Sequence, residues 1–265
     1  MEVFPGFAKI GRVLNVDEKT AENFIRKCGI HIRSRKKIPK VSPDQEDRQK
    51  TRIRKLRVDS RGKLFVMDDE SYFDVEGHSF YGGKRFAFRS IANVGKKVRF
   101  IEKSKFSPKI MMWIATSKAG HCAPYFHVSK GPVNKEININ ECIKKRLIPF
   151  IKKHHTHDDY LFWPYLASCY YAKDTIEFLR SNKIAFVEKA SNPPNAPERR
   201  PIETFWSHLK CKVYKDGFQA RNGDHLIEKI KSCLKTFDRA YFSNLMQGLR
   251  KKLLSADLNR IRSVL

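Results

Sequence analysis

Acidic side chains follow an apolar run in the segment MDDES, residues 67–71. The run predicts a buried strand, which places Asp68 and Asp69 toward its carboxyl end. Acidic residues at strand ends can converge on one spot of a sheet, and cutting or joining a phosphodiester bond needs such a convergence. Two divalent metal ions about 4 Å apart activate the attacking oxygen and stabilise the leaving one. Hard cations such as Mg²⁺ take carboxylate oxygens, so these acids are candidate ligands.

The elements that must position these acids alternate along the chain. After the MDDES strand, further strands are predicted over 109–120, 122–131, 159–166 and 184–190. Helical patterns cover 138–155 (bent near Pro149), 167–183, 198–215 and a tail from about 224 to 258. This order predicts an α/β fold with a mixed sheet flanked by helices. The sheet is expected to be antiparallel at one edge and to have parallel, helix-connected strands at the other.

The charge balance indicates the partner. The chain of 265 residues has 54 Lys and Arg against 28 Asp and Glu, a formal net charge of +26. So basic a chain repels itself unless a polyanion is near, and nucleic acid is the leading candidate. The scattered cysteines are typical of reduced core residues, and no apolar run predicts a membrane span. With a nucleic-acid partner, we expect a nuclear location.

Residues 1–32 have the pattern of a small helical unit. Asp17 is a candidate N-cap, and Ala21, Phe24 and Ile25 are expected to face inward, as are the apolar residues of the preceding helix, Phe7, Ile10, Val13 and Leu14. Two short helices joined by a tight turn fit a helix-turn-helix, although another kind of helical hairpin has the same pattern. On the first interpretation, the candidate DNA contacts are Lys19, Thr20, Asn23 and Arg26.

Residues 33–57 are rich in charge, and two prolines interrupt the first half, which is therefore predicted to be a linker. The basic cluster in it comprises Arg33, Arg35, Lys36 and Lys37. Such a cluster suits an arm on the DNA backbone or in a minor groove. A nuclear localisation signal and a solvated linker are alternative interpretations.

Three segments together resemble the mariner-like superfamily of cut-and-paste DNA transposases: MDDESYF, FWPYLASCYYAK and NPPNAPERRPIETFWSHLK. The resemblance covers residues from about 58 to 215. It implies a ribonuclease-H-like catalytic domain over 58–217, followed by a helical tail over 218–265. It also implies binding of double-stranded DNA at terminal inverted repeats and a paired complex, so a homodimer is expected. The family's chemistry uses Mg²⁺ or Mn²⁺ on a triad of Asp, Asp, and Glu or Asp.

Carried over residue by residue, the resemblance makes Asp69 the first acid and Glu203 the third. Asp68 is the fallback for the first, because side chains alternate across a strand and only one can face the site. The second acid falls on Tyr165, which 37 intervening residues separate from Glu203. The family's His after the second acid is Tyr170 here. Because a phenol has a pKa of about 10, it is a poor Mg²⁺ ligand, so metal binding is expected to be weak.

Other acidic or metal-ligating residues near position 165 do not restore the triad. Asp159 is expected at the opposite end of the strand, and Asp174 more than two helical turns downstream. The cluster of His154, His155, His157, Asp158 and Asp159 is interpreted as a solvated loop. Three functions remain open: a transposase by descent that is catalytically impaired, a domesticated DNA-binding protein without catalysis, and a general basic RNA-binding protein.

Overall fold

The computed structural model describes residues 7–30, 42–77, 94–95, 107–128, 133–157, 159–194 and 199–258. The chain divides into two compact units, Met1–Ser42 and Pro43–Leu265. Arg33, Arg35, Lys36 and Lys37 lie outside the described residues. Within the part of the chain that is described, no helix is long and apolar enough to cross a membrane.

The first unit contains two short helices, α1 (Phe7–Leu14) and α2 (Glu18–Lys27). The predicted cap is confirmed: the Asp17 carboxylate accepts the backbone N–H of Thr20 at 2.9 Å. Only Gly11 and Ala21 are buried in these helices, and a Cβ on Gly11 would lie 2.7 Å from the Val16 carbonyl oxygen. The close approach of the turn between the two helices to α1 therefore needs glycine at position 11.

The predicted inward face of the first unit is wrong in part. Val13, Leu14 and Phe24 are 77%, 55% and 62% exposed. Two helices of this length cannot enclose a core of their own, because each covers only one side of the other. The helical periodicity was sufficient to predict the helices but not which apolar residues they bury.

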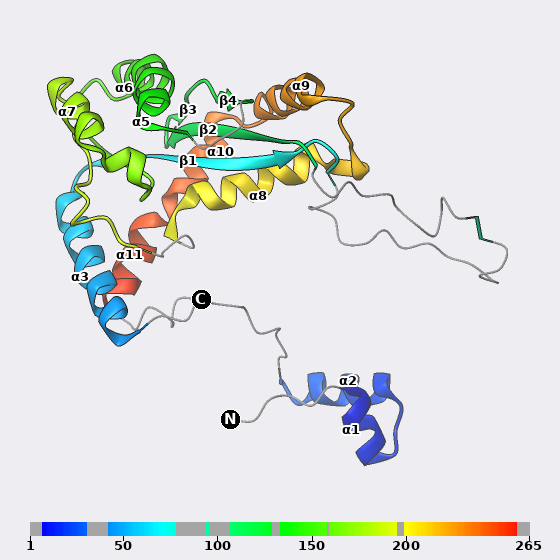
Figure 1. Cartoon of the computed structure of the whole chain (residues 1–265). Helices are drawn as coiled ribbons and strands as arrows, with labels where there is room; N and C mark the ends of the chain where they lie inside the picture. Colours follow the sequence, from blue (N-terminus) through cyan, green and yellow to red (C-terminus); the bar gives the residue numbers. More distant parts are fainter. Residues whose placement is uncertain are drawn as a thin grey trace. The chain divides into compact units, whose positions relative to one another are not determined.

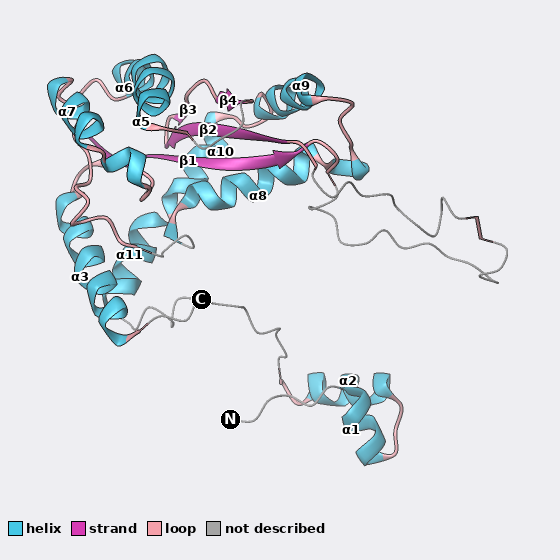
Figure 2. Cartoon of the chain, in the orientation of Figure 1, coloured by secondary structure: helices cyan, strands magenta, loops and turns pink. Residues whose placement is uncertain are grey.

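The second unit is built on a mixed sheet (Figures 1 and 2). Its strands are β1 (Leu64–Asp74), β2 (Lys109–Ser117), β3 (Gly120–His121), β4 (Tyr125–His127) and β5 (Tyr160–Trp163). The order is β3-β2-β1-β5, and β4 also pairs with β2. β1 runs antiparallel to β2 and parallel to β5. The expected sheet, antiparallel at one edge and parallel at the other, is confirmed.

Two predicted strands are shorter than expected. β3 ends at His121, before the segment 122–131 begins. The described part of that segment contributes only β4. The segment 184–190 is reduced to a single parallel bridge between Phe186 and Phe162. There the backbone N–H of Phe162 donates to Ala185, and that of Val187 donates to Phe162. The chain turns away after this one bridge.

Helices cover both faces of the sheet. The predicted helix over 138–155 forms three consecutive segments, α5 (Lys135–Ile137), the π-helical η2 (Asn138–Leu147) and α6 (Ile148–His154). Pro149 directly follows the π-helical stretch, and the backbone stays in the right-handed helical region through Leu147 and Ile148, so the helix continues past the proline without a break. The other helical segments are α3 (Pro43–Asp59), η3 (Ser168–Tyr171), α7 (Lys173–Ser181), α8 (Pro201–Val213), η5 (Lys215–Gly217), α9 (Gly223–Leu234), α10 (Arg239–Gln247) and α11 (Leu249–Leu258).

The core has two parts. The larger one joins both faces of the sheet to η2, α6, α8 and α9, and it contains the predicted tail residues Leu226, Ile230, Cys233, Leu234 and Phe237. The smaller one packs α3 and α11 side by side against the start of β1 (Figure 1). It includes Ile53 and Leu56 of α3 with Trp163 of β5. Helix α3 forms the second half of the basic segment and anchors it to the fold.

The fully buried Asn192 fixes the loop segment that it forms with Pro193 and Pro194. Its amide oxygen accepts the indole N–H of Trp163 at 2.8 Å. Its amide nitrogen donates to the Pro164 carbonyl at 2.9 Å and contacts the Tyr171 hydroxyl at 2.7 Å. From α3, Arg52 donates to the Asn192 carbonyl at 3.1 Å. The loop is thereby attached to the end of β5.

Replacing this amide should destabilise the fold. Asn192→Ala leaves the Trp163 indole N–H buried without a partner and removes one of the two donors to the Pro164 carbonyl, so the free energy of unfolding should fall by about 1–3 kcal/mol. Urea denaturation measures the change. The matched control is Asn182→Ala, whose amide makes only exposed hydrogen bonds and whose loss should cost less than about 1 kcal/mol. Equal effects of the two substitutions would contradict the role given to Asn192.

Candidate active site

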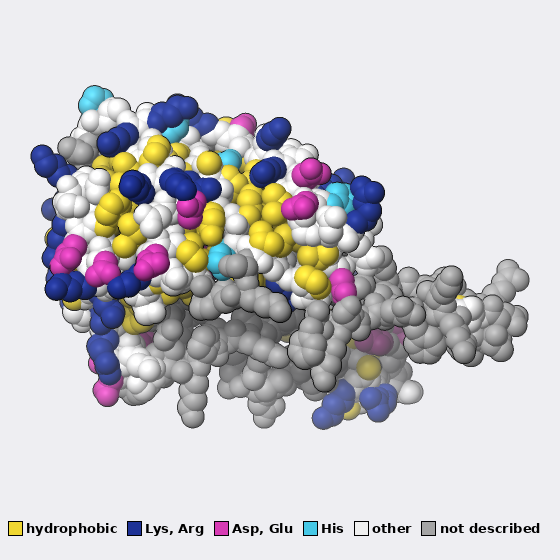
Figure 3. Space-filling model, turned by 45° about the horizontal axis from the view of Figure 1, so that its top comes forward, with side chains coloured by type: hydrophobic (Ala, Val, Ile, Leu, Met, Phe, Trp, Pro, Cys, Tyr) yellow, Lys and Arg dark blue, Asp and Glu magenta, His cyan; other side chains and the backbone are white. Residues whose placement is uncertain are grey.

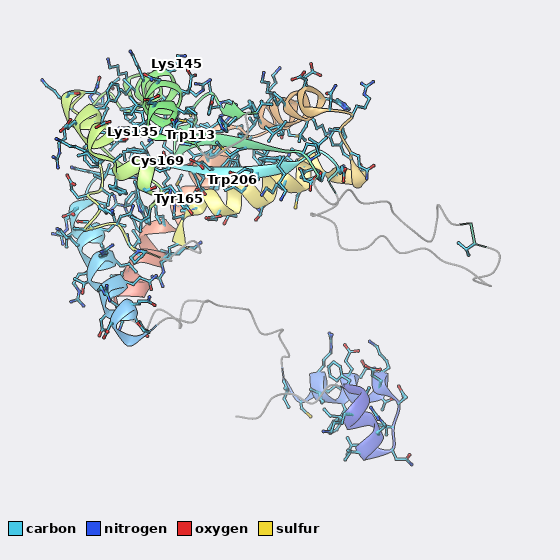
Figure 4. The ribbon with its side chains drawn as sticks, viewed as in Figure 1. Trp113, Lys135, Lys145, Tyr165, Cys169 and Trp206 are labelled. Carbon is cyan, nitrogen blue, oxygen red and sulfur yellow. The ribbon has the colours of Figure 1, made fainter. Side chains whose placement is uncertain are left out.

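The side chains of Asp68 and Asp69 point to opposite faces of β1, and a tryptophan holds each one. Asp69 accepts the indole N–H of Trp206, on α8, at 3.0 Å. Asp68 accepts that of Trp113, on β2, at 3.1 Å and the backbone N–H of Tyr165 at 2.9 Å. Figure 4 labels both tryptophans, on the two sides of the β1 ribbon. Asp69 therefore faces α8.

The register between β1 and β5 brings Tyr165 to Asp69. In this parallel pair Met67 lies opposite Trp163. Asp69 comes two residues after Met67, and Tyr165 comes two residues after Trp163. Residues of the same parity on neighbouring parallel strands share a face, and the strands are about 4.8 Å apart. Tyr165 lies two residues beyond the end of β5, and after burial the charge of Asp69 is the next cause that raises its pKa, so its phenol lies near Asp69; the residue is 39% exposed.

Glu203 completes the group from the first turn of α8. It is half-buried, three residues before the Trp206 that binds Asp69. The charge of Asp69 raises the pKa of Glu203, second to the effect of burial. Such an interaction requires the two carboxylates to be close. Asp69, Tyr165 and Glu203 therefore lie near one another, and their role as one catalytic group stays a prediction.

Burial and like charge hold the phenol neutral. The pKa of Tyr165 is raised by burial first, and then by the charges of Asp69 and Glu203. The pKa of Asp69 is also raised, mainly by burial. Lys210 lies near both acids, and burial lowers its pKa while their charges raise it. At neutral pH, position 165 presents an O–H group where a carboxylate would add a negative charge.

Arg200 joins the ends of the two strands, and the sequence analysis did not single it out. Its guanidinium donates to the carbonyl oxygens of Pro164, at 3.0 Å, and of Asp68. It also lies 5.3 Å from the centre of the Trp163 ring and 5.7 Å from that of Tyr165. The residue is almost fully buried. Its position just before α8 orients the helix that carries Glu203.

A second acidic group lies on the opposite face of the sheet. Burial raises the pKa of Asp68 to about 7, although Arg200 and two hydrogen bonds oppose this shift. Glu70 accepts the hydroxyl of the buried Tyr170 at 2.8 Å, and its pKa is also raised by burial. The ring of Tyr170 is 6.1 Å from that of Tyr165 at nearly a right angle. The side chain of Tyr170 therefore points away from Asp69 and toward Glu70.

The residues present do not fit a paired-metal site. Asp69 and Glu203 supply carboxylates, and one oxygen of Asp69 already accepts Trp206. Among the described residues, no group of three or more His, Cys, Asp or Glu side chains is placed to hold a metal ion. Hard divalent cations need several oxygen ligands, and a neutral phenol is a poor one.

Nearby acids do not replace the missing carboxylate. Asp174 pairs with Lys135 at the surface, at 2.5 Å. The Asp159 carbonyl accepts the backbone N–H of Leu64, which places Asp159 at the far end of β5, as expected.

The interpretation of the histidine cluster as a solvated loop is wrong for His155. That ring is buried, and its Nε2 is 3.0 Å from the Ser117 hydroxyl. Its Nδ1 is 3.8 Å from the Asp159 carboxylate. The spacing of the histidines gives no sign that one of them packs under β2. Asp158 lies outside the described residues.

The candidate DNA contacts on α2 are exposed, and their role stays a prediction. Lys19 and Arg26 both pair with Glu22, at 2.8 Å and 2.7 Å. Exposed pairs of this kind contribute little, so a phosphate could displace Glu22 at small cost. The Thr20 hydroxyl donates to the Asp17 carboxylate. Asn23 is exposed in the same helix.

Basic side chains are spread over the surface of the second unit. Figure 3 shows one face, on which Lys and Arg lie around and between apolar patches rather than in one stripe. The acidic side chains visible there gather in a few places. This distribution supports a general attraction for a polyanion and does not mark a single track.

The buried Asp68 predicts a pH dependence of stability. The folded chain keeps its proton up to about pH 7. Because an unfolded Asp releases its proton near a pKa of about 3.9, the stability that this group contributes is lost as pH rises toward about 7. Urea denaturation of the unmodified chain and of Asp68→Asn measures the difference in unfolding free energy. We expect the difference to fall between about pH 5 and pH 7 and to stay constant above about pH 8. A difference independent of pH would contradict the buried, proton-binding state of Asp68.

No family model matches the chain. No curated protein matches it by sequence either.

Solved structures match over most of the chain. A Mos1 transposase paired-end complex with the left transposon end has a TM-score of 0.70 at 12% identity, covering 96% of this chain and 74% of that one. The Mos1 mariner paired-end complex with Mn has a TM-score of 0.69 at 13% identity, with the same coverage of the two chains. The catalytic domain of Mos1 mariner transposase has a TM-score of 0.60 at 11% identity, covering 84% of this chain and 98% of that one. At these identities the likeness establishes the fold, and the fold of this chain is that of a mariner-like transposase with a ribonuclease-H-like sheet.

Proposed function

We propose that the chain is a DNA-binding protein of transposase descent whose strand-cleaving site is impaired at position 165. One observation carries the proposal. The phenol of Tyr165 stands beside Asp69 on the face of the sheet that Glu203 joins from α8. This is the arrangement that the mariner-like resemblance implies for three acids, with the second one replaced.

The fold and the charge support a DNA partner. The solved structures of similar fold include transposase complexes with transposon ends. The net charge of +26 favours a polyanion, and the proposed ligand is a duplex with terminal inverted repeats. A paired complex of two copies and a nuclear location belong to the same proposal.

Metal use is the function that the site supports least. Structures of similar fold include complexes with Mn and with Mg. In this chain two carboxylates would have to hold the cation, with Lys210 close to both. A like-charged ammonium opposes a metal ion, so the proposed affinity is weak and the proposed strand cleavage is impaired.

A DNA-binding role without catalysis is the second candidate. It is favoured by the packing of Tyr170, which donates to Glu70 and is fully buried. A position that serves the core in this way has a structural role that is independent of any chemistry at Asp69. The two candidates differ in whether a carboxylate at position 165 suffices to restore cleavage.

Restoring the carboxylate tests the proposal. The unmodified chain should bind duplex DNA but leave a supercoiled plasmid and an inverted-repeat duplex uncut in Mg²⁺ or Mn²⁺. Tyr165→Asp should produce detectable nicking, because Tyr165 is 39% exposed and its loss disturbs little of the core. Tyr165→Asp with Tyr170→His is the second variant, since it also restores the family's His.

The controls separate the site from general effects. Tyr72→Asp makes the same chemical change on β1, three residues after Asp69, at a position that is 54% exposed, and should leave the DNA uncut. Adding Asp69→Asn to Tyr165→Asp should abolish the nicking again. Cleavage by the unmodified chain would overturn the proposed impairment. No cleavage by either restored variant would favour the second candidate.

A further inference from the structure

A pocket away from the acidic site is lined by cations. It has a volume of about 320 Å³ and lies where the start of β1 meets the turn after β2 and the junction of α10 with α11. Lys63, Lys118 and Arg250 line it, together with Ser243, Asn244 and Gln247, and no acidic residue does so. Apolar side chains, among them Met246, form the rest of its wall.

The cations of this basic pocket are not neutralised within the described part of the chain. Neither Lys63 nor Lys118 pairs with a described carboxylate. The carbonyl of Asp159 accepts the Leu64 N–H, but its carboxylate lies 3.8 Å from His155. Arg250 donates to the carbonyl oxygens of Ser60, at 3.1 Å, and of Lys63, which fixes one edge of its guanidinium. Three like charges around one cavity favour an anion in it.

The uncharged polar groups are arranged to donate to the same anion. Ser243 and Gln247 are four residues apart on α10, and Asn244 and Gln247 are three apart, so the three side chains share one face of the helix. Hydroxyl and amide groups donate to phosphate oxygens in protein–DNA interfaces as lysine and arginine do. Together with the cations, these donors match a phosphate group better than a carboxylate on an apolar ligand.

We propose that the basic pocket binds a phosphate of a DNA backbone, as a second contact besides the acidic site. This rests on the proposed function, since the ligand is the same duplex. Lys63 precedes Asp69 by six residues along a strand, which is roughly 20 Å at about 3.3 Å per residue. One duplex can span that separation, so a strand at the acidic site and a phosphate in the pocket can belong to the same molecule.

Charge variants test the pocket with a matched control. Binding of a labelled duplex by Lys63→Gln with Lys118→Gln is measured by fluorescence anisotropy over a range of salt. The slope of log affinity against log salt should become shallower by about 1, because the one phosphate contact of the pocket is lost. The control, Lys144→Gln with Lys152→Gln, removes the same charge from exposed positions on η2 and α6. Its slope should change by clearly less.

Uncharged variants exclude a long-range charge effect. Ser243→Ala with Asn244→Ala should weaken DNA binding several-fold with no change in net charge. Ser181→Ala with Asn182→Ala makes the same two changes at the exposed end of α7 and should leave binding unaltered. Thermal unfolding of all four double variants checks that each remains folded.

The outcomes separate this inference from the proposed function. If the unmodified chain fails to bind duplex DNA, both fall. If it binds, but the pocket variants behave like their controls, this inference alone falls. If AMP or inorganic phosphate at constant ionic strength binds the unmodified chain, and does not bind Ser243→Ala with Asn244→Ala, while DNA binding is the same in both, the pocket holds a free phosphate compound and the DNA contact is overturned.

Discussion

The parallel pairing of β1 with β5 is the constraint on which the candidate site depends. It fixes Met67 opposite Trp163, and with it the position of Tyr165 next to Asp69. A slip of one residue would turn Tyr165 to the other face, toward Trp113. Three features hold this register: the Asp68 carboxylate on the Tyr165 N–H, the Arg200 guanidinium across both strands, and the Asn192 amide under Trp163.

The buried acids are tolerated because each is given donors. Asp69 has the Trp206 indole, Asp68 has the Trp113 indole, and Glu70 has the Tyr170 hydroxyl. Even so, burial raises the pKa of all three. In a catalytic fold, the cost of burying several acids is offset when metal ions supply positive charge. The positive charges that lower the pKa of Asp69 in this chain are those of Arg200 and Lys210.

Sequence patterns predicted the elements and the convergence of the site better than they predicted its surroundings. The alternation of strands and helices, and the motifs around Asp69, Tyr165 and Glu203, were sufficient for the sheet and for the three side chains that meet. Hydrogen bonds between distant segments left no local signal, so Arg200, the Asn192 network and the buried His155 were missed. Exposure of Phe24 was also missed, because helical periodicity does not say whether a partner covers the face. The basic pocket brings together residues from both ends of the second unit, which no spacing could reveal.

Counting bound metal ions tests most directly whether Tyr165 has removed a ligand from the site. The free Mn²⁺ signal in electron paramagnetic resonance gives the number of ions taken up by the unmodified chain, by Asp69→Asn and by Tyr165→Asp. We expect the unmodified chain and Asp69→Asn to bind Mn²⁺ weakly and alike, and Tyr165→Asp to bind it more tightly. Tight uptake of two ions by the unmodified chain, lost in Asp69→Asn, would contradict the account.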